Sequence, residues 1–192
     1  MTQSVRSHTG PTALIKLAQD VLNTEIAGLA AVRDRLNART PEKAPLVLAL
    51  GLLAACTGRV VVTGIGKSGL VGRKLAATFS STGTPAFFLH PVEGAHGDLG
   101  SLRKDDVIIA ISNSGETAEL NAILPALKSL GTSLIAMTGR EDSTLGRLAD
   151  VTLHSGVPRE ACPHGLAPTA STTAVLALGD ALAVCLMQLK SF

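Results

Sequence analysis

The sequence contains no tryptophan, no tyrosine and only four phenylalanines in 192 residues. A surface that binds single-stranded nucleic acid normally offers aromatic rings on which bases stack. The 17 lysines and arginines are nearly balanced by 15 acidic residues, and a net charge of +2 is too small for the basic stripe of a nucleic-acid-binding protein. We therefore expect no nucleic-acid partner.

Cysteine is also scarce. Cys56, Cys162 and Cys185 are odd in number, far apart and without a C-x-x-C pair, so they do not outline a disulfide framework. The first residues lack the apolar stretch of a secretory signal. Of two apolar runs, 46–56 is too short to span a bilayer and 174–189 is interrupted by an aspartate. These absences predict a soluble, cytoplasmic protein with no membrane partner.

Hydrophobic residues are abundant at 46% of the chain, whereas charged residues make up 17%. The length suits a single domain with a sizeable core, which we expect over residues 11–192, after a frayed N-terminal segment of residues 1–10. So apolar a composition predicts that some helix faces are buried against other subunits. We expect a homo-oligomer, either a dimer or a tetramer.

The hydrophobic pattern predicts the order of the elements. Apolar residues at helical spacing indicate helices over residues 11–36 and 41–55, which together form an N-terminal helical arm. Five short, continuous apolar runs then alternate with helical segments, as is typical of parallel strands covered on both faces. We therefore expect an α/β fold with a doubly wound, flavodoxin-like, five-stranded parallel sheet flanked by helices. The expected strands are 59–63, 86–89, 107–111, 133–137 and 151–154, and the later helices are 68–81, 117–130, 143–148 and 171–189.

The stretch around which the rest is organised is residues 64–69, Gly-Ile-Gly-Lys-Ser-Gly, between the first strand and a helix. A strand, a glycine turn and a helix N-terminus form a ready anion site. The glycines fit G-x-G-x-x-G, but residues 89–91 offer no acid for a ribose, and a P-loop would need glycine where Val61 stands. Two interpretations remain, a phosphate-binding turn and a purely structural tight connection.

A second group of polar residues, 112–117, follows the third strand with the sequence Ser-Asn-Ser-Gly-Glu-Thr. The hydroxyls of Ser112, Ser114 and Thr117 can donate to phosphate oxygens beside first-turn amides, a neutral cradle that needs no arginine. The alternative is that Ser114 is an N-cap and Glu116 a first-turn acid favoured by the helix dipole. Because the pattern holds more hydroxyls than a cap needs, we predict phosphate binding.

Two further segments at the strand ends carry titratable groups. Residues 90–100 contain two histidines, two acids and three glycines, and we expect no regular element there. His90 and His96 match no standard zinc spacing, so acid/base or hydrogen-bonding use is favoured, with binding of an inhibitory metal left open. In the proline-bounded loop 158–168, Glu160 is a candidate general base, although a lone loop glutamate is often only solvated.

Five segments together closely resemble the sugar isomerase (SIS) domain of the bacterial D-arabinose 5-phosphate isomerase family. The resemblance runs from about residue 60 to residue 183 with little interruption. The S-x-S-G-x-T pattern alone marks the broader sugar-phosphate isomerase superfamily, and its combination with Gly-Lys-Ser and His-Gly-Asp-Leu-Gly is more specific. The segments are residues 64–69, 80–85, 96–100, 112–117 and 166–173.

The resemblance implies an isomerase that interconverts D-arabinose 5-phosphate and D-ribulose 5-phosphate through an enediol, for lipopolysaccharide precursor synthesis. Such a reaction needs a base that reaches C1 and C2 and a donor for the developing oxyanion, but no cofactor and no metal. The small-molecule partner would be a sugar phosphate. The implied catalytic residues are Lys67, His96, Glu119 and Glu160, and the implied substrate-binding residues are Gly66, Ser68, Ser112, Asn113, Ser114, Thr117 and Thr172.

Other implications concern the ends of the site. The resemblance puts His96 near subunit boundaries. Family members continue past the position of Phe192 into a His-Pro-Gly-Gly segment, whose histidine is placed in the active site, and commonly into a pair of nucleotide-sensing-type repeats. We expect this chain to lack that tandem repeat region. The alternatives are a non-catalytic sugar-phosphate sensor, which would not need Lys67 or Glu160, and an isomerase for another phosphosugar.

Overall fold

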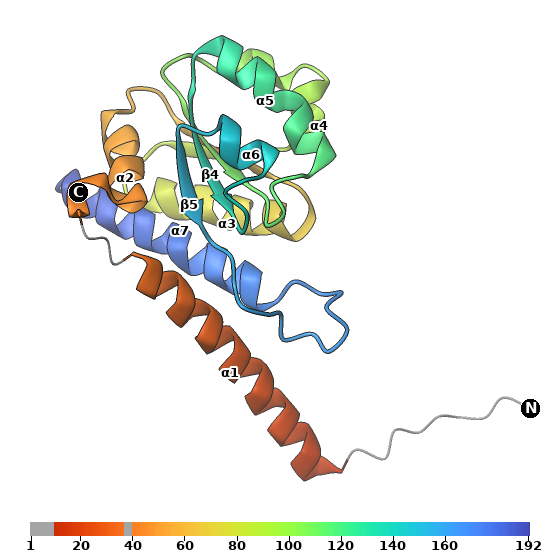
Figure 1. The fold of residues 1–192 in the computed structure, drawn as a ribbon. Helices are drawn as coiled ribbons and strands as arrows, with labels where there is room; N and C mark the ends of the chain where they lie inside the picture. The colour runs from red at the N-terminus through yellow and green to blue at the C-terminus, as the bar shows by residue number, and fades with distance from the viewer. Residues whose placement is uncertain (1–9, 37–39) are drawn as a thin grey trace, which may run out of the picture.

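Five parallel strands form the centre of the molecule in the computed structural model, which describes residues 10–36 and 40–192 (Figure 1). Their order is β2-β1-β3-β4-β5, as a flavodoxin-like sheet predicts. The expected frayed N-terminus lies, except for Gly10, outside the described residues. The strands are β1 Val60–Gly64, β2 Ala86–Leu89, β3 Val107–Ile111, β4 Ser133–Thr138 and β5 Val151–His154.

Helices cover both faces of the sheet (Figure 1). One face packs against α2, α3 and α7, and α1 lies outside these against α7. The other face packs against α5 and α6, with α4 beside α5. The helices are α1 Pro11–Arg35, α2 Pro45–Ala55, α3 Gly66–Ser81, α4 Pro91–Ala95, α5 Ala118–Leu130, α6 Thr144–Leu148 and α7 Ala170–Leu189, with 3-10 turns η1 Pro41–Lys43 and η2 Asp98–Ser101.

The core is divided between the two faces by the alternation of side chains along each strand. Val60 and Val62 belong to the cluster under α3 and α7, whereas Val61 belongs to the cluster under α5. Every residue of β1 and β3 is buried. The continuous apolar runs of the sequence therefore do correspond to strands covered on both faces.

Two expectations about the secondary structure are wrong. The second helix begins at Pro45 instead of residue 41, because Ala44, which precedes a proline, is extended and residues 41–43 form only a 3-10 turn. Residues 90–100 are not irregular, since they form α4 and η2. Pro91 at the first position and the His90 ring, whose Nδ1 accepts from the Val92 amide, start α4 locally.

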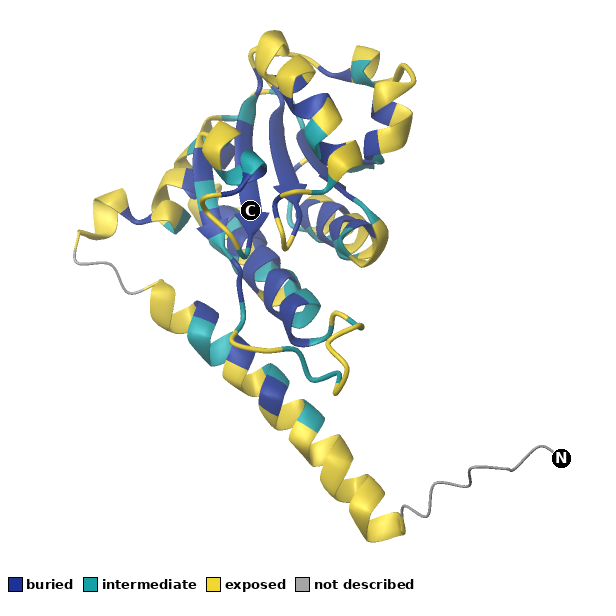
Figure 2. Ribbon diagram, turned by 45° about the vertical axis from the view of Figure 1, so that its right-hand side comes forward, coloured by how far each residue is buried: buried dark blue, intermediate teal, exposed yellow. Residues whose placement is uncertain are grey.

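The helix α1 is only partly covered. Its buried residues are Thr24, Gly28 and Val32, and the half before Thr24 projects from the body (Figure 2). In this half, Ile15 is 61% exposed and Leu22 is 59% exposed. This end of the predicted helical arm therefore presents apolar surface that the single chain leaves open.

One described helix, α7, is long and apolar enough to cross a membrane by length and composition alone. Half of its most apolar window is buried, and it packs against α1, α2 and α3. It therefore has the packing of a core helix.

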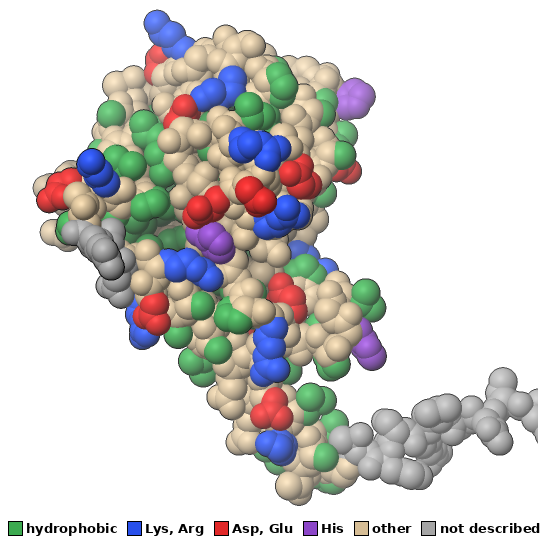
Figure 3. Space-filling view, in the orientation of Figure 1, with side chains coloured by type: hydrophobic (Ala, Val, Ile, Leu, Met, Phe, Trp, Pro, Cys, Tyr) green, Lys and Arg blue, Asp and Glu red, His purple; other side chains and the backbone are tan. Residues whose placement is uncertain are grey.

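On the face drawn in Figure 3, acidic and basic side chains of the described residues are interspersed, without a continuous basic stripe.

Candidate active site

The first part of the site is the glycine turn between β1 and α3. Gly66 has a φ of 59°, which L side chains rarely adopt, and a Cβ on Gly69 would lie 2.8 Å from the Gly64 carbonyl oxygen. The turn therefore requires glycine. It puts Lys67 and Ser68 in the first turn of α3, where free amides and the helix dipole favour an anion.

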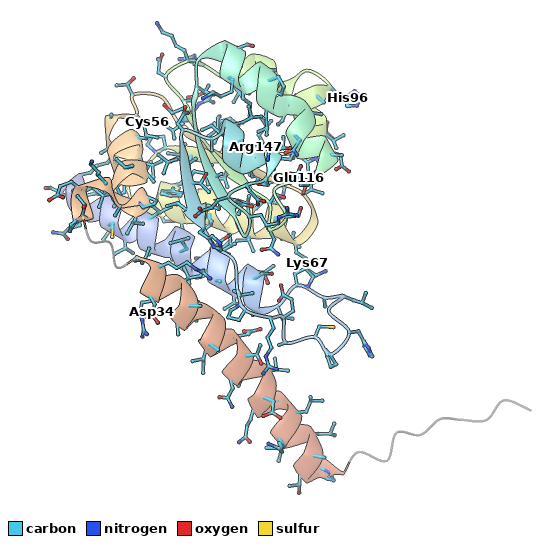
Figure 4. All side chains as sticks on the ribbon, viewed as in Figure 1. Asp34, Cys56, Lys67, His96, Glu116 and Arg147 are labelled. Carbon is cyan, nitrogen blue, oxygen red and sulfur yellow. The ribbon has the colours of Figure 1, made fainter. Side chains whose placement is uncertain are left out.

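A cleft of about 190 Å³ opens between this turn and the first turn of α7. Lys67 and Ser68 line one side, Thr172 lines the other, and Asn113 comes from the end of β3. Figure 4 shows Lys67 pointing away from the sheet toward the loop that leads into α7. The cleft is smaller than pockets for drug-sized ligands, about 300–1,000 Å³, and so suits a small ligand. The other lining residues are Ile65, Val71, Ile111, Pro168, Ser171 and Val175.

The three predicted phosphate hydroxyls have different surroundings. Ser112 is buried, and its hydroxyl bonds to Thr117 Oγ1 at 2.8 Å and accepts from the Gly115 amide at 3.1 Å. Ser114 is exposed, and its hydroxyl accepts from the Glu116 amide at 3.2 Å. The N-cap of α5 is Thr117, so the alternative that Ser114 is an N-cap is wrong. The Ser114 O–H is free to donate to a ligand, whereas Ser112 holds the loop together.

The two acids near the start of α5, Glu116 and Glu119, also differ in their surroundings. Glu116 Oε1 accepts from the Thr144 amide at 2.8 Å, and this bond, with one from the Thr144 hydroxyl, holds the pKa of Glu116 below its usual range. The carboxylate of Glu116 thereby connects the loop of residues 112–117 to the first residue of α6; Figure 4 labels Glu116. Glu119 is exposed in the first turn of α5 and is not among the residues that line the cleft.

Glu160 lies at the N-terminus of α7. Its Oε2 accepts from the Thr169 amide at 2.8 Å, the Thr169 hydroxyl at 3.1 Å and the Ser171 amide at 3.3 Å. Partial burial raises the pKa of Glu160, but the bonds from Ser171 and Thr169 outweigh it, and the pKa lies below its usual range. The carboxylate is therefore ionised at neutral pH.

Glu160 faces a second hollow, of about 360 Å³, which shares Asn113 with the cleft. Arg140 and Arg159 line this hollow beside Ser114. Sequence analysis missed both arginines, although each follows a strand, β4 or β5, at the edge where a ligand was expected. The predicted cradle is thus neutral at its hydroxyls but has two cations close by.

The architecture and its strand-end cleft agree with a comparison against known families, in which the model described as "SIS domain" matches residues 53–185. This chain belongs to the SIS domain family. Curated relatives of this SIS domain are named arabinose 5-phosphate isomerase KdsD. The Salmonella typhi protein is 53% identical over 174 residues, covering 91% of this chain and 51% of the relative. The Pseudomonas aeruginosa protein is 57% identical over 146 residues, covering 76% and 45%. The chain spans about half the length of the curated relatives it matches.

Solved structures share the fold. The structure of E. coli CFT073 c3406 in complex with arabinose 5-phosphate matches with a TM-score of 0.87 and 45% identity, covering 95% of this chain and 94% of that chain. The Vibrio vulnificus NanR protein complexed with ManNAc-6P matches with a TM-score of 0.73 but only 22% identity, covering 95% and 64%, and so shows the fold alone. The predicted family and fold are confirmed.

The two histidines of the predicted site lie outside the cleft of the SIS domain. His90 is half-buried and serves α4 through its Nδ1. His96 is exposed at the end of α4, far from Lys67 in Figure 4. Among the described residues, no three His, Cys, Asp or Glu side chains gather as metal ligands. A single chain therefore does not bring His96 together with the other predicted catalytic residues.

Proposed function

We propose that this SIS domain is an aldose–ketose isomerase that interconverts D-arabinose 5-phosphate and D-ribulose 5-phosphate. The observation that carries the proposal is the small cleft in which Lys67 and Ser68 face Thr172, in a chain 53% identical to a curated arabinose 5-phosphate isomerase. The structure of c3406 in complex with arabinose 5-phosphate supports it further, because this chain covers 94% of that chain. The two chains therefore match over nearly their whole lengths, and the other chain binds a sugar phosphate.

The phosphate would bind between the first turn of α3 and the loop that leads from β3 to α5, which meet at the cleft through Ser68 and Asn113. Ser68 supplies one hydroxyl and the α3 amides, made accessible by the positive φ of Gly66. Ser114 and Thr117 supply others before α5, with Ser112 as the support of their loop. Neutral donors at helix termini bind a dianion without requiring a bound counter-ion.

The isomerisation moves one proton between C1 and C2. A base removes it from one carbon to give the enediol and returns it to the other, while a donor stabilises the oxyanion. Glu160 suits the base because its carboxylate is ionised at neutral pH, and the Lys67 ammonium suits the oxyanion. Glu119, in the first turn of α5, would be a further catalytic acid or base. These steps need no cofactor.

We also propose that the enzyme is a homo-oligomer, a dimer or a tetramer, in which His96 of the partner subunit completes the cleft. The exposed apolar end of α1 supplies surface for such an interface, and His96 is exposed and remote from Lys67 in its own chain. Mixing Glu160→Gln with His96→Ala subunits should restore part of the activity if sites are shared. Strictly additive loss, or a monomer by light scattering, would refute the sharing.

The compartment that fits this chemistry is the cytoplasm, where the lipopolysaccharide precursor pathway would draw on pentose phosphates. Cys56, Cys162 and Cys185 are all free thiols, which is the usual state in a reducing compartment. Thiol titration of the purified native protein should find three free thiols.

The direct test is incubation with ribulose 5-phosphate in deuterated water. We expect arabinose 5-phosphate carrying deuterium at C2, and no turnover by Lys67→Met, with wild-type folding in both proteins. If no arabinose 5-phosphate forms and no deuterium is exchanged, the isomerase proposal is refuted. Binding of the sugar phosphate without turnover would favour a sensor, and turnover of a hexulose 6-phosphate in preference would favour another phosphosugar.

A further inference from the structure

The helix α7 is capped in an unusual way. Its N-cap residue is Thr169, with φ −135° and ψ −80°, but the Thr169 side chain does not accept from an amide of α7. The acceptor is Glu160, whose Oε2 receives the amides of Thr169 and Ser171. The carboxylate of Glu160, nine residues before the N-cap, thus accepts hydrogen bonds from amides at the start of this 20-residue helix.

The Thr169 hydroxyl makes two hydrogen bonds within the loop that precedes α7. It donates to Glu160 Oε2 at 3.1 Å and accepts from the Ala161 amide at 2.9 Å. One hydroxyl therefore joins the two ends of the loop 160–169, using both its donor and its acceptor capacity. Three hydrogen bonds from Thr169 and Ser171 converge on Oε2 of Glu160, and the same residue lines the second hollow.

The same contact fixes one wall of the cleft. Ser171 and Thr172, in the first turn of α7, line the cleft together with Lys67. The Thr172 hydroxyl donates to the Thr169 carbonyl at 2.8 Å, so the wall and the Glu160 carboxylate depend on one backbone position. A shift of Thr169 would move both the proposed base and the wall against which the sugar lies.

We propose that Thr169 is a positioning residue of the isomerase, whose hydroxyl fixes the Glu160 carboxylate in its place beside the second hollow. The proposal rests on the proposed function and adds a residue that never touches the sugar. Catalysis depends strongly on such alignment, because a displacement of about 1 Å costs on the order of 10²-fold in rate. Serine can replace both bonds of the threonine hydroxyl, whereas valine keeps the shape and removes them.

Other charged groups also face Glu160. Arg140 and Arg159 share the second hollow with it, and Asp20 of α1 and Cys162 share a further hollow of about 300 Å³ on its other side. None of these is changed in the variants below. A shift in the titration of Glu160 between those variants therefore reports the loss of the hydroxyl, because these neighbouring charges stay constant.

The test compares Thr169→Val, Thr169→Ser and, as a matched control, Thr173→Val. Thr173 lies in the same first turn and donates to a different carboxylate, Glu25 Oε2 at 3.2 Å. We expect Thr169→Val to lower kcat about tenfold or more with KM changed by less than roughly threefold. The acidic limb of its pH profile should move to higher pH, since a donor to the charged form is lost. Thr169→Ser should restore both, and Thr173→Val should match the wild type.

A second measurement needs no substrate. The carboxyl carbon of Glu160, assigned in labelled protein with Glu160→Gln, should titrate at higher pH in Thr169→Val and at the wild-type pH in the other two variants. Unchanged kcat and titration in Thr169→Val would overturn the proposal. Equal loss of stability and activity without rescue by serine would also overturn it, in favour of a structural role. If the wild type turns over nothing, the isomerase proposal fails, and an unmoved titration then refutes the positioning as well.

Discussion

Replacement of Ser114 by alanine gives the most direct test of the phosphate site. Ser114 is exposed, and its hydroxyl makes a single bond to the protein, accepting the Glu116 amide at 3.2 Å. Its proton is therefore available to a phosphate oxygen. Because a phosphate is bound similarly in the ground state and the transition state, losing this donor should raise KM and leave kcat nearly unchanged.

The magnitude follows from the contacts. A hydrogen bond to a charged group contributes about 1.5–3 kcal/mol, which corresponds to an increase in KM of about 10- to 150-fold. Stability should fall by no more than about 1 kcal/mol, because the one bond lost among the described residues is exposed. Ser112→Ala is the matched control, since the buried Ser112 hydroxyl bonds to Thr117 and Gly115. That variant should lose about 1 kcal/mol of stability, because it removes the buried bond to Thr117, while the Gly115 amide keeps its bond to the Ser112 carbonyl.

The assay is steady-state isomerisation in both directions, with urea unfolding of the same preparations. The reasoning requires that Ser114→Ala lose affinity without stability and that Ser112→Ala lose stability. If Ser114→Ala lowered kcat at constant KM, the hydroxyl would act in the chemistry instead of holding the phosphate. If Ser112→Ala were as stable as the wild type, the bonds assigned to its buried hydroxyl would be wrong.

Three other predictions concern the remaining parts of the site. Glu160→Gln should lower kcat by roughly 10²-fold or more with KM nearly unchanged, and a rise in KM alone would move the base to Glu119 or His96. Because the folded pKa of Glu160 is depressed, it stabilises the fold above the ordinary carboxyl pKa, and this stability is lost as pH falls through the folded value. Urea midpoints at successive pH values should therefore show a weaker acid dependence in Glu160→Gln. Gly69→Ala should cost about 1–3 kcal/mol, because its Cβ would meet the Gly64 carbonyl. Gly51→Ala, with open space around it, should be neutral or gain up to about 1 kcal/mol in thermal unfolding.

The sheet could be predicted because its strands are short runs with sharp polar boundaries. Residues 107–111, for example, lie between two aspartates and a serine, and the strand has those bounds. Residues 90–100 could not be predicted, because α4 has only five residues and shows no helical period. Its start depends on the His90 ring and Pro91, a local contact that hydrophobic patterning does not report.

The site could be predicted as far as parallel strands bring their carboxyl ends together. Lys67, Ser68 and Asn113 follow β1 and β3, which are neighbours in the sheet, and they meet in one cleft. The capping of α7 by Glu160 depends on how a loop closes, which spacing does not reveal. The different fates of Ser112 and Ser114 depend on which hydroxyl is buried, and the sequence pattern treats them alike.

The straight course of α7 has a practical consequence for spectroscopy. A 20-residue helix is about 30 Å long, and its first turn borders the cleft while its last turn packs beside α2 (Figure 1). A fluorophore attached at the position of Phe192 would therefore be separated from the cleft by most of the molecule. A label at that end would therefore report on the fold without obstructing the entry of a sugar phosphate.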